Sequence, residues 1–217
     1  MDEANKKIEI EVLTVSMFAT NCYLVSCAKT KEAIIIDPGA NGKRIIEKIR
    51  NNNLYIKYIV NTHGHVDHIG ANGKLKEIFE APILLGEKDL QLYEKPGFGL
   101  SFFFKKQPKP DQLIVDGNQI HFGEAFMEVK DTPGHSPGSI SLLLDSAIFC
   151  GDTLFAGSVG RTDLPGGSHG QLMQSIKEKI FVLNDHVIIY PGHGPATSVS
   201  KEIDSNPFID FINEDKL

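Results

Sequence analysis

Four apolar segments of this 217-residue sequence run directly into histidine or aspartate. They read "IVNTHGHVDH", "VKDTPGH", "IFCGDT" and "IYPGHG". Short apolar runs of this kind are typical of buried strands. Buried strands form a rigid base, and the loops at their ends can converge on one rim. The sequence therefore predicts a sheet structure in which ionisable side chains at several strand ends meet in one cleft.

The chain as a whole contains two successive blocks of predicted strands, each closed by helices. In the first block we expect strands at 8–15, 21–26, 32–36, 55–63 and 81–86, and helices at 42–53, 70–80 and 87–95. In the second block we expect a hairpin over 112–123 around Asp116-Gly117, strands at 125–135, 139–145, 147–155 and 186–194, a helix at 170–183 and a polar tail. Two such blocks predict two packed sheets with helices outside, in a single domain over 1–217.

Composition narrows the classes of function. The formal charge of −6 and the pI near 5.7 argue against a nucleic-acid partner, since the only basic cluster is 104–110. No stretch approaches the roughly 20 apolar residues of a membrane span, and the N-terminus lacks a signal-peptide core, so we expect a cytoplasmic protein. Cys22, Cys27 and Cys150 lie in apolar settings and are interpreted as buried, reduced thiols.

The segment "THGHVDH" concentrates three of the eight histidines. In an extended segment, positions two apart face the same way, so His63, His65 and Asp67 are expected to share a side. His68 follows where the chain bends into a helix, and Gly64 removes a side chain that would crowd the site.

The strand ends together supply more ligands than one metal ion needs. The candidates are His63, His65, Asp67, His68, His135, Asp152 and His193. A tetrahedral zinc takes four ligands, so two adjacent metals would use all of them. One metal would take His63, His65 and His135; the other would take Asp67, His68 and His193, with Asp152 as the bridge.

Each candidate has a structural alternative. Asp67 fits a helix N-cap, and His135, Asp152 and His193 fit turn positions rich in glycine and proline. The coincidence of all of them with the HxHxDH cluster favours metal binding. His121 and His186 are interpreted as surface or packed residues, while the role of His169 stays open.

These motifs, in this order, resemble the metallo-β-lactamase superfamily, and within it the hydroxyacylglutathione hydrolases (glyoxalase II). The resemblance rests on "THGHVDHIG", "DTPGHSPGS", "FCGDTLF" and "YPGHGP" and covers nearly the whole chain. It implies an α+β fold, an αββα sandwich of two mixed sheets flanked by helices. It also implies a site for two divalent metal ions at one edge of the sheets, with zinc favoured and iron or manganese as alternatives.

A further stretch, "GSVGRTDLPGGS", is similar to the compact bacterial glyoxalase II-like subgroup and to persulfide dioxygenases. By that resemblance Arg161 and Asp163 lie in a loop near the site, either contacting it or closing the loop as an ion pair. Longer glyoxalase II enzymes carry a helical extension that supplies basic residues to glutathione. Here 24 residues follow His193 and end in the acidic "DFINEDKL", so the thiol carrier stays open.

The predicted activity is hydrolysis of a small-molecule thioester, such as S-lactoylglutathione, by a metal-activated hydroxide. Asp67 is the expected catalytic residue, holding one metal and orienting the hydroxide. A thiolate leaves readily at neutral pH, so no dedicated acid is required. In the loop 96–110, Lys105, Lys106 or Lys109 are candidates to meet substrate carboxylates. The protein is expected to act as a monomer or homodimer.

Other functions of the same motifs stay open. The principal alternative is a persulfide dioxygenase with one iron on His63, His135 and Asp152, a facial triad that suits Fe(II). A nuclease, a β-lactamase, a flavodiiron module and a non-catalytic metal-binding protein rank lower. A nuclease would need a basic face and a β-lactamase would normally carry a secretion signal, and this sequence shows neither. A flavodiiron module would typically have Glu at the position of His65.

Overall fold

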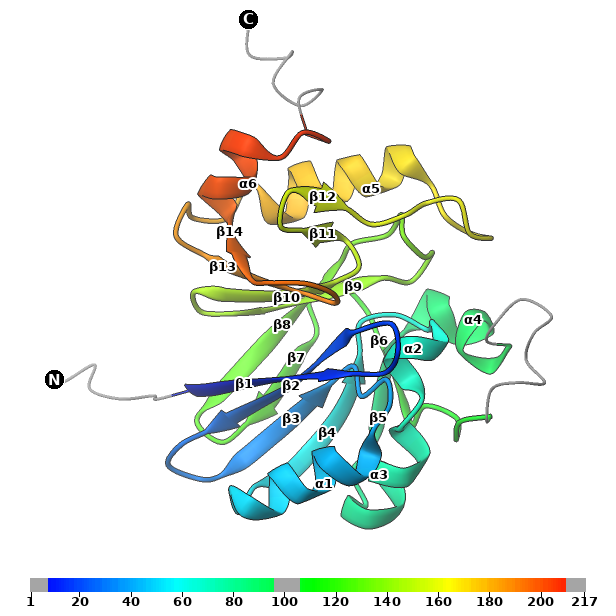
Figure 1. Ribbon diagram of the computed structural model, residues 1–217, viewed down its shortest axis with the longest axis vertical. Coiled ribbons are helices and arrows are strands. Elements are labelled where there is room, and N and C mark those ends of the chain that lie inside the picture. Colours follow the sequence, from blue (N-terminus) through cyan, green and yellow to red (C-terminus); the bar gives the residue numbers. More distant parts are fainter. Residues whose placement is uncertain (1–7, 96–105, 210–217) are drawn as a thin grey trace, which may run out of the picture.

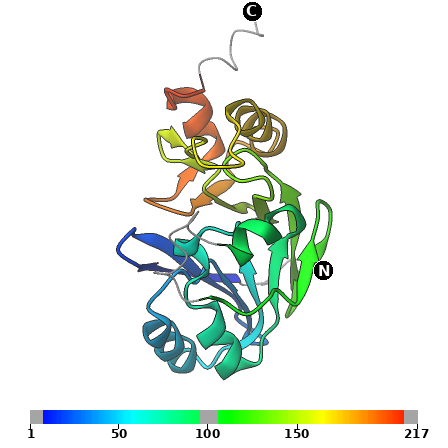
Figure 2. The same cartoon turned by 90° about the vertical axis from the view of Figure 1, so that its right-hand side faces the viewer.

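Two six-stranded sheets lie face to face, with helices on their outer sides (Figure 1). The structure is a computed structural model, and it describes residues 8–95 and 106–209. A view turned by 90° shows the same four layers, with the two sheets between two groups of helices (Figure 2). The predicted αββα sandwich is confirmed.

The first sheet has the order β1-β2-β3-β4-β5-β6. Its strands are β1 (Ile8–Val15), β2 (Thr20–Cys27), β3 (Glu32–Ile36), β4 (Tyr55–Asn61), β5 (Ile83–Gly86) and β6 (Gln112–Ile114). The β1-β2 and β2-β3 pairs are antiparallel, whereas β3-β4, β4-β5 and β5-β6 are parallel. The sheet is therefore mixed, and the ends of its parallel strands lie at one edge.

The second sheet has the order β14-β13-β10-β9-β8-β7. Its strands are β7 (Gln119–Phe122), β8 (Ala125–Asp131), β9 (Ile140–Leu144), β10 (Ala147–Gly151), β13 (Ile188–Pro191) and β14 (Thr197–Ser198). Only the β10-β13 pair is parallel among the described strands of this sheet. A separate two-stranded ribbon joins β11 (Leu154–Phe155) to β12 (Ser158–Val159).

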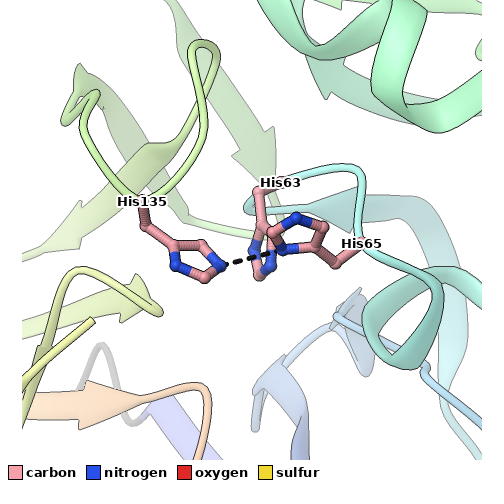
Figure 3. Close-up of side chains that lie close together, drawn as sticks. All are labelled: His63, His65 and His135. Atoms are coloured by element: carbon pink, nitrogen blue, oxygen red, sulfur yellow. Dashed lines mark hydrogen bonds between the residues drawn. The ribbon is translucent and has the colours of Figure 1, made fainter. Parts of the chain in front are cut away.

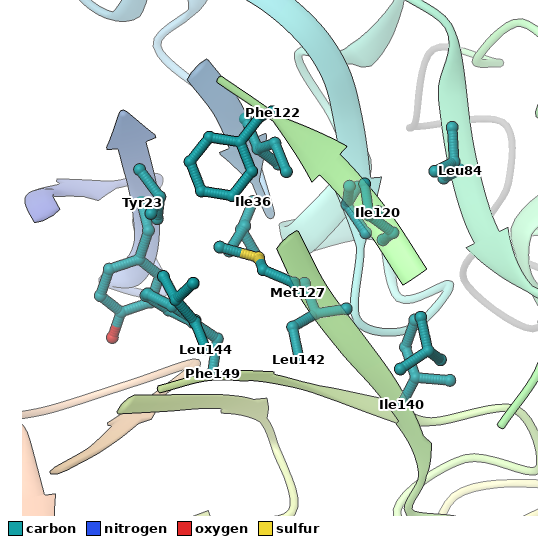
Figure 4. Packing of buried hydrophobic residues seen from close by; sticks show 14 of the residues in the cluster. Tyr23, Ile36, Leu84, Ile120, Phe122, Met127, Ile140, Leu142, Leu144 and Phe149 are labelled. Atoms are coloured by element: carbon teal, nitrogen blue, oxygen red, sulfur yellow. The ribbon is translucent and has the colours of Figure 1, made fainter. Parts of the chain in front are cut away.

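Apolar side chains from both sheets interlock between them (Figure 4). Tyr23 and Ile36 of the first sheet and Met127, Leu142 and Phe149 of the second belong to this central cluster. Phe149 packs against the Tyr23 ring at a centroid distance of 5.1 Å. The dense packing of this layer fixes one sheet relative to the other, and with it the loops at their shared edge.

Each sheet has its own layer of helices. The helices are α1 (Gly42–Asn51), α2 (Val66–Ile69), α3 (Asn72–Phe79), η1 (Glu87–Asp89), α4 (Leu90–Glu94), α5 (His169–Ser175), the π-helical turn η3 (Ile176–Ile180) and α6 (Val199–Ser205). Helices α1 and α3 pack on the first sheet, and α5, η3 and α6 pack on the second. Helix α1 buries Ile45, Ile46 and Ile49, an apolar face at helical spacing. None of the described helices is long and apolar enough to cross a bilayer.

One expectation about the second block is wrong. The segment 112–123 is not a hairpin, because β6 pairs with β5 in one sheet and β7 pairs with β8 in the other. The turn at Asp116-Gly117 carries the chain between the sheets, and turn chemistry alone does not reveal which strand each flank pairs with. The tail, which was expected only to be polar, also contains regular structure. It forms β14 and helix α6, whose N-cap Ser198 accepts a hydrogen bond from the Lys201 N–H.

Candidate metal centre

The ionisable residues meet because the strands that precede them end at one rim. β4 ends two residues before His63, β10 one residue before Asp152, and β13 two residues before His193. At this rim the backbones approach closely, since a Cβ on Gly192 would lie 2.1 Å from Asp152 Oδ1. A glycine is therefore required beside the carboxylate.

A first group of possible metal ligands consists of His63, His65 and His135, whose ligand atoms all lie within 4.8 Å of one another. The three imidazoles point toward one another from two separate loops (Figure 3). His65 Nδ1 and His135 Nε2 are 2.8 Å apart. His63 Nε2 is buried and has no hydrogen-bond partner among the described residues. Three converging imidazoles with an orphaned nitrogen fit a divalent cation better than they fit a hydrogen-bonded core.

A second group consists of Asp67, His68 and His193, again within 4.8 Å of one another. His68 Nε2 lies 3.3 Å from His193 Nε2. Asp67 Oδ2 lies 3.4 Å from His193 Nε2 and 3.6 Å from His68 Nε2. The ligand atoms of this group thus face one point, as in the first group.

Asp152 lies between the two groups. Its carboxylate oxygens lie 3.5 Å from His68 Nε2, 3.6 Å from His135 Nε2 and 3.6 Å from His193 Nε2. Oδ1 is buried without a hydrogen-bond partner among the described residues. A carboxylate that contacts histidines of both groups has the position that a bridging ligand would need.

The backbone conformation at Asp67 differs from the extended one that was expected. His65 is extended, but helix α2 begins at Val66, so Asp67 does not continue the alternation of His63 and His65. Asp67 therefore lies on a helical turn with His68, and its carboxylate belongs to the second group. The shared side expected for His63, His65 and Asp67 is therefore wrong, because alternation applies only as far as the strand-like segment reaches.

Asp37 is a buried residue of the site that sequence reasoning missed. Its carboxylate accepts hydrogen bonds from the Thr62 N–H at 2.8 Å and the Thr62 hydroxyl at 2.6 Å. The same carboxylate lies 3.0 Å from His68 Nδ1. An acceptor at Nδ1 directs Nε2 of His68 toward Asp152 and His193. The sequence did contain an indication of this role, because β3 is also followed directly by an aspartate, in "AIIIDPG".

Asp89 is a second missed residue, and it joins two ligand loops. Its carboxylate accepts hydrogen bonds from the Gly64 N–H at 2.7 Å, the Gly138 N–H at 2.6 Å and the Ser136 hydroxyl at 2.7 Å. Gly64 lies between the first two histidines, and Ser136 follows His135. No sequence pattern indicated this role, since Asp89 lies within a segment that simply predicts a helix.

The pKa values of the clustered histidines shift in two opposite directions. Burial lowers the pKa of His63 well below its usual value and that of His65 to about 4. Burial acts against the charge of His68 as well, but Asp152 and Asp37 raise its pKa well above the usual value. For His193, hydrogen bonding to Asp67 likewise overcomes burial and raises the pKa. Protons on His68 and His193 thus balance the carboxylates, a role that metal charge would take over.

The raised pKa values of His68 and His193 predict that metal affinity falls as the pH falls. Both residues keep a proton at pH values where a free histidine is neutral, and a metal ion has to displace it. We expect proton release on zinc binding at pH 7 and a loss of about tenfold in affinity per pH unit for each proton displaced. Calorimetric titrations in two buffers of different ionisation enthalpy measure the release. Equal heats in both buffers would contradict the prediction.

A cavity of about 510 Å³ is lined by five of the seven candidate ligands, namely His65, Asp67, His135, Asp152 and His193. Its walls are largely apolar, and Arg161 also lines it; the wall residues are Phe18, Val66, Phe155, Ser158, Val159, Arg161 and Leu164. Arg161 forms a two-pronged ion pair with Asp163, at 2.7 and 2.8 Å. The loop ion pair expected as one alternative is thus present, and Arg161 also borders the cavity.

Of the three lysines expected near the substrate, the two in the described part of the chain, Lys106 and Lys109, do not line this cavity. Lys106 lines a different cavity, beside the start of α1 and α3, and Lys109 lies 3.2 Å from Glu94. Lys105 lies outside the described residues. Sequence proximity of three lysines to an aromatic run did not reveal which face they occupy.

His121, His186 and the three cysteines agree with their structural interpretations. His121, His169 and His186 are exposed, and none lines the histidine cavity. All three cysteines are free and buried. Burial raises the pKa of the Cys150 thiol to about 12, so it is not a reactive thiolate.

An αββα sandwich with histidine and aspartate clusters at the common rim of its sheets defines a class of metal-dependent hydrolases. A family model described as "Metallo-beta-lactamase superfamily" matches residues 15–193. The chain belongs to this superfamily.

Two curated relatives extend over nearly the whole chain. One, from Haemophilus influenzae, is named "Hydroxyacylglutathione hydrolase GloC"; it is 37% identical, with 93% of this chain and 98% of the relative covered. The other, from Bacillus subtilis, is named "Probable metallo-hydrolase YqgX"; it is 38% identical, with 91% and 95% covered.

Three solved structures are also similar. BLEG-1 B3 metallo-beta-lactamase has a TM-score of 0.87 at 36% identity, covering 93% of this chain and 99% of that one. TTHA1623 in a di-iron-bound form has a TM-score of 0.83 at 33% identity, covering 91% of this chain and 99% of that one. ETHE1 from Myxococcus xanthus has a TM-score of 0.80 at 28% identity, covering 96% of this chain and 92% of that one. The fold is common to all three, while their names differ in activity.

Proposed function

We propose that this metal-dependent hydrolase cleaves a thioester, with S-lactoylglutathione as the first candidate substrate. The observation that carries the proposal is the composition of the cavity. Apart from the possible metal ligands, its described lining offers apolar side chains, the Ser158 hydroxyl and Arg161, and no carboxylic acid or free imidazole. A leaving thiolate requires no proton donor at neutral pH, whereas a leaving amine does.

We propose His63, His65 and His135 as ligands of one divalent cation and Asp67, His68 and His193 as ligands of a second, with Asp152 as the bridge. When bound, such a pair supplies a water of lowered pKa and polarises a carbonyl oxygen. Zinc is the first candidate because three imidazoles suit it, and the di-iron form of TTHA1623 supports iron as the alternative.

Three further roles in the proposed reaction belong to residues of the chain itself. Asp67 is the proposed catalytic residue, orienting the attacking water, and the Thr20 hydroxyl donates to its carboxylate at 3.4 Å. Asp37 keeps Nε2 of His68 directed into the site. Arg161 is the proposed substrate contact at the cavity wall. The curated name of the Haemophilus influenzae relative supports a hydroxyacylglutathione as substrate.

We expect the zinc-loaded protein to release thiol from S-lactoylglutathione, and the protein treated with a chelator to release it at least a hundredfold more slowly. The reason is that the attacking water depends on the metal for its lowered pKa. Thiol release is followed with a chromogenic thiol reagent. Hydrolysis of a chromogenic β-lactam with no thiol release from any thioester would contradict the proposal.

A persulfide dioxygenase is the second candidate, with one iron on His63, His135 and Asp152. The similarity to ETHE1 from Myxococcus xanthus over 96% of the chain is the observation that favours it. Iron-loaded protein that consumes oxygen with glutathione persulfide, and zinc-loaded protein that leaves thioesters intact, would select this function over the first.

A further inference from the structure

The turn between β1 and β2, residues 16–19, lies against the second ligand group. The Phe18 carbonyl is 3.0 Å from His193 Nδ1. A carbonyl oxygen can only accept, so Nδ1 carries the proton and Nε2 of His193 keeps its lone pair for a metal ion. Just after the turn, the Thr20 hydroxyl donates to the Asp67 carboxylate at 3.4 Å. This one turn and the residue that follows it thus hold two of the three residues of that group.

The Ser16 hydroxyl connects these two contacts. Its oxygen accepts a hydrogen bond from the Phe18 N–H at 3.1 Å and lies 3.2 Å from the Thr20 hydroxyl oxygen. Because Thr20 donates its only hydroxyl proton to the Asp67 carboxylate, the proton between the two hydroxyls belongs to Ser16. The hydrogen bonds therefore run in one direction, from the Phe18 N–H through two hydroxyls to Asp67, and each polarises the next.

The backbone at Ser16 has a conformation that side chains with a Cβ rarely adopt. Its φ is 64°, and that of Ala19, at the other end of the turn, is 57°. The Ser16 N–H donates to the Asn41 side-chain oxygen at 2.9 Å, which holds the residue in place. A glycine would adopt this φ without strain but would have no hydroxyl. The turn conformation alone thus does not explain a serine here, and strained positions of this kind cluster at functional sites.

We propose that Ser16 is a positioning residue for the second cation, because its hydroxyl holds the Phe18 carbonyl against His193 and the Thr20 hydroxyl against Asp67. This inference rests on the two-metal arrangement of the proposed function. It goes beyond that arrangement in assigning the stability of one metal site to a residue that touches neither metal nor substrate.

Other contacts hold the first ligand group, so the effect of Ser16 is selective. His135 Nδ1–H donates to the Arg161 carbonyl at 2.8 Å, and His63 Nδ1 lies 3.1 Å from the Thr62 hydroxyl. Loss of the Ser16 hydroxyl leaves these contacts intact. It removes the acceptor of the Phe18 N–H and the donor to Thr20, so His193 and Asp67 have to be ordered as the metal binds.

The test measures zinc binding to the metal-free protein by competition with a chromophoric chelator that resolves two equivalents. Loss of an outer partner of a metal ligand costs about 10–100-fold in affinity, and we expect Ser16→Ala to weaken one equivalent roughly tenfold. The other equivalent should stay within about twofold of the wild-type affinity, since its ligands keep their outer partners. His193→Ala, which removes a ligand of the second group, identifies the equivalent that belongs to that group.

A second variant and a matched control separate the hydroxyl from the backbone. Ser16→Gly removes the hydroxyl and also relieves the positive φ, so it should weaken the same equivalent as Ser16→Ala. Met17→Ala is the matched control, because Met17 lies on the same turn and is 90% exposed. It should change neither equivalent. Urea unfolding of the metal-free proteins verifies that each variant is folded.

The outcomes separate this inference from the proposed function. Wild-type affinity of the second-group equivalent in Ser16→Gly overturns the role of the hydroxyl, while the two-metal centre stands. Equal weakening of both equivalents, or the same loss in Met17→Ala, also overturns it, because the effect is then not specific to the hydroxyl and its group. A wild-type protein that binds a single equivalent overturns the two-metal arrangement of the proposed function, and this inference with it.

Discussion

Replacing Asp152 by Ala is expected to remove most of the bound metal and to lower thioester hydrolysis by a factor on the order of a thousand. Removal of an outer partner of a metal ligand already costs about 10–100-fold, and Asp152 is the proposed bridge itself. Its pKa, although burial acts to raise it, is held below the usual value mainly by the charge of His68. The carboxylate is therefore ionised throughout the neutral range and available as a ligand.

Metal content by atomic emission and thiol release measure the two effects of the Asp152 variant separately. Asp152→Asn keeps the shape and removes the charge, which distinguishes lost coordination from a packing defect. Asp145→Asn is the matched control, because it removes one exposed carboxylate at the other end of β10. An Asp152→Ala protein that kept two equivalents of metal and full activity would contradict the proposed bridge.

The convergence of the candidate ligands could be predicted because it follows from strand ends. Parallel strands place their ends at one edge, and β3–β4 and β10–β13 do so in the two sheets. Among the described residues, two of three clusters of possible ligands have the membership expected from ligand count, and the third combines Asp37 with His63 and His68. What alternation could not supply is the backbone turn at Val66, which ends the extended segment before Asp67.

The supporting residues were less accessible to sequence reasoning. Asp37 followed the same rule as the other strand ends and could have been included. Asp89 could not, because its partners Gly64 and Gly138 are 25 and 49 positions away in sequence. The pairing of β6 and β7 with different sheets is likewise a long-range outcome, since three- and four-residue strands carry little register information of their own.

Asp89→Asn is expected to destabilise the protein by about 3 kcal/mol, although residue 89 does not line the cavity. The wild-type carboxylate accepts from two backbone N–H groups and a hydroxyl. An asparagine has one acceptor oxygen, and its NH₂ would face N–H or O–H donors. Each buried donor left unpaired costs roughly 1–3 kcal/mol. Urea unfolding of the metal-free protein measures the change.

The same variant tests whether Asp89 aligns the two ligand loops. If it does, zinc affinity should also fall by roughly tenfold, because the loops of His63 and His135 have to be ordered as the metal binds. Asp145→Asn should change the free energy of unfolding by less than about 0.5 kcal/mol and leave zinc affinity unchanged. A loss of stability at Asp89 with unaltered zinc affinity would restrict this residue to a structural role. Unaltered stability would show that its three hydrogen bonds contribute nothing net, contrary to the cost of unpaired buried donors.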